Sequence, residues 1–89
     1  RLSDTLIEPT IVINVPEKAK LFSKEVFGPV ILVNSVSGIE EGIKEINNSP
    51  YGLQAGIFTG SIKAAFKFAE EVECGGIMIN EIPTFRVDQ

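Results

Sequence analysis

The chain alternates between short, nearly unbroken apolar runs and stretches in which apolar residues recur every three or four positions. The unbroken runs are rich in valine and isoleucine, a composition typical of buried strands. We therefore expect strands over residues 8–15, 30–36, 54–59 and 76–80. Pro9 suits the start of the first strand or an edge position, because proline lacks an amide donor.

Two of the intervening stretches carry helical periodicity. In the first, apolar residues fall at spacings i, i+4 and i+7, namely at Ile39, Ile43 and Ile46. Ser37 and Glu40 match a capping box, in which a serine hydroxyl and a glutamate carboxylate each satisfy a free amide at a helix start. We therefore expect a helix from this box to residues 47–50, where Asn-Asn-Ser-Pro ends it.

The second periodic stretch follows the third strand. Thr59 or Ser61 is the expected N-cap, and Cys74-Gly75-Gly76 ends the helix because glycine commonly follows a helix end. The expected buried face consists of Ile62, Ala65, Phe66, Ala69 and Val72. A shorter turn or helix over residues 17–23 follows the first strand.

Strands and helices that alternate with short connections favour parallel βαβ units with right-handed crossovers. The expected fold class is therefore α/β, a three-layer βαβαβ parallel sheet in one small domain. The apolar fraction of 44% is high for 89 residues, so we expect some apolar surface to face a partner or the remainder of a larger protein. The chain begins at Arg1 and reads as a piece of a longer one.

Charge and composition narrow the classes of function. With 8 Lys and Arg against 12 Asp and Glu, the net charge is −4 and no basic cluster is available for phosphates, so we expect no nucleic-acid partner. No apolar run is long enough to span a bilayer and no signal-peptide pattern is present, so we expect no membrane association and a cytoplasmic location. With Cys74 as the single cysteine and no histidine, disulfides, zinc sites and histidine-dependent catalysis are not expected.

The run Glu25-Val26-Phe27-Gly28-Pro29-Val30 is the stretch whose residue types point beyond packing. Gly28 can adopt backbone angles barred to other residues, and Pro29 fixes its own φ, so the pair predicts a rigid corner before a strand. Such a corner would present Glu25 as an acceptor for sugar hydroxyls and Phe27 as a ring that packs on a flat ligand. The alternative is a solvated glutamate and a core phenylalanine beside a turn.

Four separated pieces, in order and with matching gaps, closely resemble the late part of the catalytic domain of NAD(P)-dependent aldehyde dehydrogenases. They are Pro9-Thr10, the run from Glu25 to Val30, Asn48-Ser49-Pro50-Tyr51-Gly52-Leu53-Gln54-Ala55-Gly56-Ile57-Phe58-Thr59, and Gly75-Gly76-Ile77-Met78-Ile79-Asn80 with Pro83-Thr84-Phe85-Arg86-Val87-Asp88. The last piece is most similar to the branch with lactaldehyde, succinate-semialdehyde and non-phosphorylating glyceraldehyde-3-phosphate dehydrogenases.

The resemblance implies oxidation of an aldehyde to an acid through a thiohemiacetal, hydride transfer to NAD or NADP, and thioester hydrolysis. It implies that Glu25 holds the nicotinamide ribose hydroxyls, that Phe27 lies beside the nicotinamide, and that Phe85 forms an aromatic wall of the aldehyde pocket. Arg86 could bind a substrate carboxylate or phosphate, or form a surface salt bridge. Asn80 is either a strand-end cap or a group that orients the active-site loop.

The family's nucleophilic cysteine, general-base glutamate, oxyanion-hole asparagine and dinucleotide-binding domain lie earlier in its chains. Cys74 does not match the nucleophile, and we expect a packing or surface thiol. Residues 1–89 are therefore expected to be part of a catalytic domain, inactive alone, with the remainder of the parent dehydrogenase or further copies as partners in a homo-oligomer. The alternative is a non-catalytic, self-associating α/β module.

Overall fold

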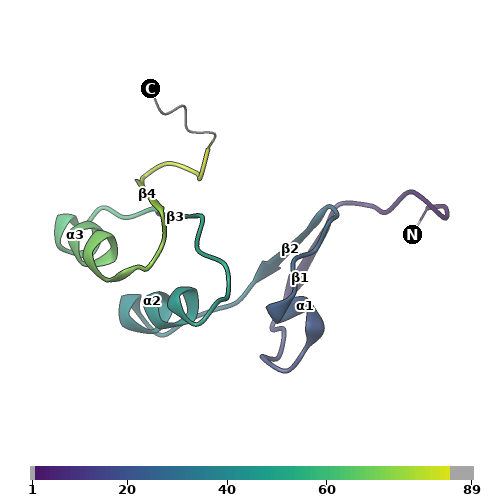
Figure 1. Ribbon diagram of the computed structural model, residues 1–89, viewed down its shortest axis with the longest axis horizontal. Coiled ribbons are helices and arrows are strands. Elements are labelled where there is room, and N and C mark those ends of the chain that lie inside the picture. The colour runs from purple at the N-terminus through teal and green to yellow at the C-terminus, as the bar shows by residue number, and fades with distance from the viewer. Residues whose placement is uncertain (1, 85–89) are drawn as a thin grey trace. The chain divides into compact units, whose positions relative to one another are not determined.

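The computed structural model describes residues 2–84 of the chain. These residues fall into two compact units, unit 1 over Arg1–Ser35 and unit 2 over Val36–Gln89. Each unit contains a pair of parallel strands joined through a helix, and Figure 1 shows the elements of both. The two units are described separately below.

Unit 1 contains strand β1 (Thr10–Ile13), the short helix α1 (Lys20–Ser23) and strand β2 (Val30–Val33). β1 and β2 pair in parallel from Thr10↔Val30 to Ile13↔Val33. Side chains alternate between the faces of a strand, and one face carries the half-buried residues Val12, Val30 and Leu32. The other face is exposed and consists of Ile11, Ile13, Ile31 and Val33.

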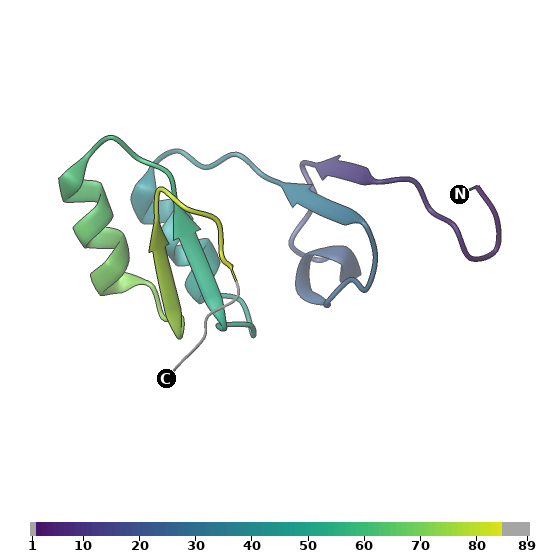
Figure 2. The same cartoon turned by 90° about the horizontal axis from the view of Figure 1, so that it is seen from above.

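Unit 2 contains helix α2 (Ile39–Asn47), strand β3 (Gln54–Ile57), helix α3 (Ile62–Glu71) and strand β4 (Gly76–Ile79). β3 and β4 pair in parallel from Gln54↔Gly76 to Ile57↔Ile79, and Figure 2 shows the two strands side by side. The element order predicted from the sequence is confirmed. The strands are shorter than expected. β1 and β4 end where Asn14 and Asn80 adopt left-handed backbone angles, with φ of 54° and 57°.

The buried side chains of the described residues all belong to unit 2: Ile43, Ala55, Ala65, Phe68 and Val72. Ile43 of α2, Ala55 of β3 and Phe68 of α3 belong to one cluster, so both helices pack on the same face of the β3–β4 pair. Asn47 joins the helix ends: its Nδ2 donates to the Glu71 carbonyl at 2.8 Å, and its Oδ1 accepts from the Glu73 amide at 2.8 Å.

The predicted α/β class with parallel strands is confirmed within each unit. Among residues 2–84, the strands hydrogen-bond in two pairs, β1–β2 and β3–β4. In unit 2 the helices share one face, since α2 and α3 contribute to the same core cluster. Apolar runs indicate that strand faces are covered and do not specify which element covers each face.

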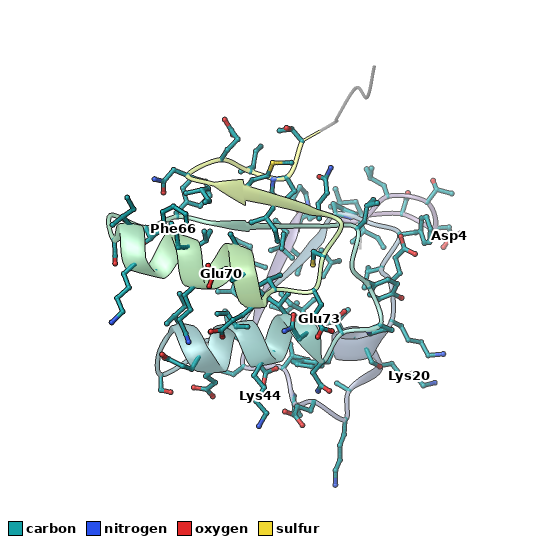
Figure 3. The ribbon with its side chains drawn as sticks, turned by 60° about the vertical axis from the view of Figure 1, so that its left-hand side comes forward. Asp4, Lys20, Lys44, Phe66, Glu70 and Glu73 are labelled. Carbon is teal, nitrogen blue, oxygen red and sulfur yellow. The ribbon has the colours of Figure 1, made fainter. Side chains whose placement is uncertain are left out.

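The predicted buried face of α3 was partly wrong. Ala65 and Val72 are buried as expected, but Phe68 is 4% exposed whereas Ile62 and Phe66 are 76% and 62% exposed. Figure 3 shows Phe66 and Glu70 on α3. Two apolar stripes run along this helix, and a helical period alone does not decide which of them faces the strands.

Of the two N-caps expected for α3, Thr59 and Ser61, Ser61 is the one observed, whereas the N-cap expected for α2 was wrong. The Ser61 hydroxyl accepts from the Ala64 amide at 3.2 Å, as an N-cap does. For α2 the N-cap is Gly38, and Ser37 lies one residue before it. The Ser37 amide and hydroxyl instead donate to Glu41 Oε2 at 2.6 and 2.5 Å. The capping box is therefore shifted: Glu41 reaches back in the place predicted for Glu40.

No helix between residues 2 and 84 combines the length and apolar character needed to cross a bilayer.

Candidate cofactor and substrate site

The corner before β2 is held by a chain of short backbone hydrogen bonds. The Gly28 amide donates to the Val26 carbonyl at 3.0 Å, and the Val30 amide donates to the Gly28 carbonyl at 2.8 Å. These i to i+2 bonds form successive tight turns centred on Phe27 and Pro29. The Thr10 amide also donates to the Pro29 carbonyl at 2.8 Å, which ties the corner to β1.

Phe27 lies at the tip of this corner with 93% of its surface exposed. An exposed ring of this size leaves a large apolar area in water, which favours a contact with a ligand or another protein surface. Glu25, two residues earlier, is also exposed. Both side chains are therefore exposed in the structure, and their assignment to a cofactor site stays a prediction.

Gly28 does not use the conformational freedom that the sequence suggested. No glycine of the described residues has a positive φ. A methyl group added at Gly28 would meet no atom within 4 Å. Pro29 and the hydrogen bonds around it therefore set the corner, and glycine is not required there by backbone geometry.

Phe85 and Arg86 lie outside the described residues. The chain that leads to them leaves β4 at Asn80, whose backbone is left-handed. The Asn80 amide donates to the Ile57 carbonyl at 2.7 Å, and its Oδ1 accepts from the Thr59 amide at 2.8 Å. Asn80 thus caps the end of the strand pair, which is the first of the two alternatives, and a role in orienting an active-site loop stays a prediction.

Unit 1 has the same latch. Asn34 lies one residue beyond β2, and its Oδ1 accepts from the amide of Val15, two residues beyond β1, at 3.2 Å. Asn80 and Thr59 occupy the equivalent positions beyond β4 and β3. In each unit an asparagine side chain therefore replaces the next ladder hydrogen bond where the strands stop. Asn34 was not among the residues expected to have such a role.

Cys74 is partly buried and packs against the core cluster of unit 2. This position agrees with the predicted packing role.

The perturbed acid–base groups of unit 2 lie on its helices: two hydrogen bonds from Ser37 lower the pKa of Glu41, and the hydrogen bond to Glu71 raises the pKa of Lys67. Lys67 Nζ lies 2.8 Å from Glu71 Oε1. These interactions stabilise helix surfaces and are not part of the candidate site.

Two further residues contact the segment that leads to Phe85 and were not singled out from the sequence. Gln54 Nε2 donates to the Thr84 carbonyl at 3.0 Å. Gly56 lies so close to the same segment that a methyl group added to it would be 2.9 Å from the Glu81 carbonyl oxygen. The available signal was the glycine inside a strand pattern, which marks a close approach of another backbone.

Residues 2–89 match the model of the aldehyde dehydrogenase family. The chain belongs to that family, as the resemblance implied. Members of this family generally depend on NAD(P) and act on aldehydes.

Individual members of the family are similar to the chain over nearly its whole length. It is 51% identical over 85 residues to a lactaldehyde dehydrogenase of Methanococcus maripaludis, a match that covers 96% of this chain and 18% of the relative. Aldehyde dehydrogenase 21 of Physcomitrella patens, solved in complex with the product succinate, has a TM-score of 0.90 and 42% identity. That match covers 98% of this chain and 18% of the moss enzyme, so the chain spans under a fifth of both proteins.

An indole-3-acetaldehyde dehydrogenase solved with NAD+ is also similar, with a TM-score of 0.82 and 32% identity. The match covers 89% of this chain and 16% of that enzyme.

Proposed function

We propose that this chain is a segment of the catalytic domain of an NAD(P)-dependent aldehyde dehydrogenase that oxidises a small aldehyde to a carboxylic acid. In this proposal Glu25 and Phe27 form the cofactor side of the site, and Phe85 and Arg86 line the aldehyde pocket. The nucleophilic cysteine and the general base come from other parts of the parent enzyme. The 89 residues alone are expected to show no turnover, because the reaction needs both groups.

The observation that carries the proposal is the position of Phe27. Its ring is 93% exposed at the tip of a corner that is hydrogen-bonded to both strands of unit 1. A ring held on such a support can pack on a flat nicotinamide without losing much conformational freedom on binding. The preceding Glu25 is an acid of the kind that accepts hydrogen bonds from the two vicinal hydroxyls of a ribose.

A bound NAD(P) would supply the hydride acceptor for the reaction. This chain would contribute alignment: the carboxylate of Glu25 would hold the ribose, and the Phe27 ring would restrict how the nicotinamide can move. Alignment of the reacting atoms is worth several orders of magnitude in rate. The identity of the aldehyde is proposed from the named relatives, which favour lactaldehyde or a similar short, polar aldehyde.

The remainder of the parent enzyme is the proposed partner of unit 1. The exposed face of the β1–β2 pair carries Ile11, Ile13, Ile31 and Val33, each between 49% and 69% exposed. A whole strand face of branched apolar side chains is typical of a sheet covered on both sides. If the remainder of the parent enzyme packs on this face, these apolar side chains are buried in the complete protein. We also propose a homo-oligomer, and the cytoplasmic location stays a prediction.

The test uses the complete polypeptide that carries this segment. Glu25→Gln removes the charge and keeps the shape, so loss of a charge-assisted hydrogen bond should reduce kcat/KM for NAD(P) by about 10- to 100-fold. Phe27→Ala should slow hydride transfer and increase the kinetic isotope effect of a deuterated aldehyde. The matched control is Glu17→Gln, an exposed acid in the turn before α1. Wild-type kinetics in Glu25→Gln would contradict the ribose role.

The second candidate is a non-catalytic, self-associating module, and the same exposed strand face favours it. The two candidates differ in what covers that face. The native mass of the isolated polypeptide and that of the complete one distinguish them. Self-association of 9.7 kDa chains that is abolished by Ile11→Ser and Ile31→Ser, with no longer parent polypeptide present, would favour the module.

A further inference from the structure

The segment after β4, Glu81–Thr84, runs back along β3 and is called the return segment here. Near its start, the Glu81 carbonyl oxygen and Pro83 Cδ lie against Gly56, where a methyl group would be 2.9 and 3.4 Å away. At its end, the Thr84 carbonyl accepts from Gln54 Nε2 at 3.0 Å. Because Gln54 precedes Gly56, the return segment runs opposite to β3. Figure 2 shows the chain turning back beside β3 after β4.

The face of β3 that receives the return segment is the one away from the core. Ala55 and Ile57 belong to the core cluster or pack against it, so Gln54 and Gly56 lie on the opposite face of the strand. Gly56 allows the backbone of the return segment to approach closely, and Gln54 provides a donor for it. One face of β3 therefore packs against the helices, and the other face contacts the return segment.

Asn80 fixes where the return segment begins. Its left-handed backbone reverses the chain, and its two hydrogen bonds, to the Ile57 carbonyl and from the Thr59 amide, hold the reversal against the end of β3. A polar contact with Thr84, a close backbone contact at Gly56 and the Asn80 latch thus hold the return segment along its length. The return segment leads directly to Phe85.

We propose that Gln54 and Gly56 are positioning residues for aldehyde recognition and act through the return segment. This inference rests on the proposed function, in which Phe85 forms a wall of the aldehyde pocket. The face of β3 sets the path of the return segment, and that path sets where the chain enters the pocket wall. Substitutions on β3 should then change which aldehydes are accepted. The affinity for the dinucleotide, which depends on unit 1 in the proposed function, should stay the same.

Gly56→Ala is the main test, in the complete enzyme. The added methyl group forces the return segment to move, because a Cβ contact of 2.9 Å with a backbone oxygen is too close. Displacements of about 1 Å can reduce rates about 100-fold, so kcat/KM for the preferred aldehyde should fall by about 10- to 100-fold. The matched control is Gly60→Ala, which also adds a methyl group in unit 2 but meets no atom within 4 Å.

Gln54 gives a second pair of variants that does not crowd the fold. Gln54→Leu removes the donor to Thr84 and keeps a similar volume, whereas Gln54→Glu places a carboxylate against the Thr84 carbonyl oxygen. Loss of aldehyde specificity should therefore be larger in Gln54→Glu than in Gln54→Leu. The readouts are KM and kcat for straight-chain aldehydes of increasing length, the KM for NAD(P), and the melting temperature.

The outcomes separate this inference from the proposed function. A changed order of preference among the aldehydes, with an unchanged KM for NAD(P) and an unchanged melting temperature in the Gln54 variants, supports the inference. An unchanged order of preference in both Gly56→Ala and Gln54→Glu overturns it, as does an equal loss for every aldehyde together with a lower melting temperature. Absence of NAD(P)-dependent aldehyde oxidation in the wild-type enzyme instead contradicts the proposed function.

Discussion

Phe68 and Phe66 lie two positions apart on α3 and provide a sharp test of how unit 2 is packed. Phe68 is 4% exposed and belongs to the core cluster with Ile43 and Ala55. Phe66 is 62% exposed. Replacement of each phenylalanine by alanine in the 89-residue chain removes the same atoms from the same helix. Differences in helix propensity therefore cancel between the two variants, and the difference in stability reports burial alone.

The expected magnitudes follow from the exposed fractions. Truncation of a buried phenylalanine costs about 3–5 kcal/mol, from the lost transfer free energy and the cavity that remains. Full burial of such a side chain is worth about 1.5–3 kcal/mol, so Phe66, with little more than a third of its surface covered, should contribute about 1 kcal/mol or less. Small domains are stable by only about 5–15 kcal/mol, so Phe68→Ala should remove a large part of the total.

Urea unfolding followed by far-ultraviolet circular dichroism measures both values. For a domain of this size each kcal/mol also changes the melting temperature by about 4–8 °C, so thermal unfolding should separate the variants clearly. A larger loss for Phe66→Ala than for Phe68→Ala would refute the packing described here. Such a result would instead indicate that the face of α3 expected from the sequence, which includes Phe66, is the buried one.

Further predictions concern the corner, the strand-end latch and a helix start. Gly28→Ala in the complete enzyme should leave NAD(P) kinetics and melting temperature near wild type, because the added methyl group meets no atom within 4 Å. Asn80→Ala should destabilise unit 2 by about 1–3 kcal/mol in urea unfolding, because it leaves the Thr59 amide without its acceptor and puts alanine in a left-handed conformation. Asn80→Gly should lose less stability, because glycine adopts that conformation without strain. The hydrogen bonds from Ser37 lower the pKa of Glu41, so their stabilisation is complete above the ordinary glutamate pKa and is lost as the pH falls through the lowered value. Ser37→Ala should therefore raise the pKa of Glu41 in an NMR titration, and its stability should differ from wild type at neutral pH but not at strongly acidic pH.

Most of the fold could be predicted because the hydrophobic periodicity and the residues that end helices and strands indicated the same elements. The stripe through Ile43 ends before a proline, and β1, β2 and β4 are apolar runs that each stop at an asparagine. Periodicity did not decide between two apolar stripes on α3, because both have helical spacing and the choice depends on the partner surface. The N-cap of α2 is Gly38 and not Ser37, one residue later than expected. The Ser37 hydroxyl donates to the Glu41 carboxylate, because a serine hydroxyl can donate as well as accept a hydrogen bond.

The candidate site could be predicted only where its residues stand out chemically. Glu25 and Phe27 are proposed as site residues because an acid and a ring precede a Gly-Pro corner, and the structure exposes both. Gln54 and Gly56 could not be identified in this way. Their role depends on the path of a segment that is distant in sequence, and a glycine in a strand reveals that something approaches closely without revealing what.

Unit 1 contains no buried side chain among residues 2–35, whereas unit 2 has its own core. Segments with few buried contacts open at low free-energy cost, so the corner at Phe27 should exchange its amide hydrogens much faster than the strands of unit 2. In the proposed enzyme the remainder of the polypeptide covers the apolar face of unit 1, so the amide hydrogens of this corner should exchange more slowly there than in the isolated 89-residue chain.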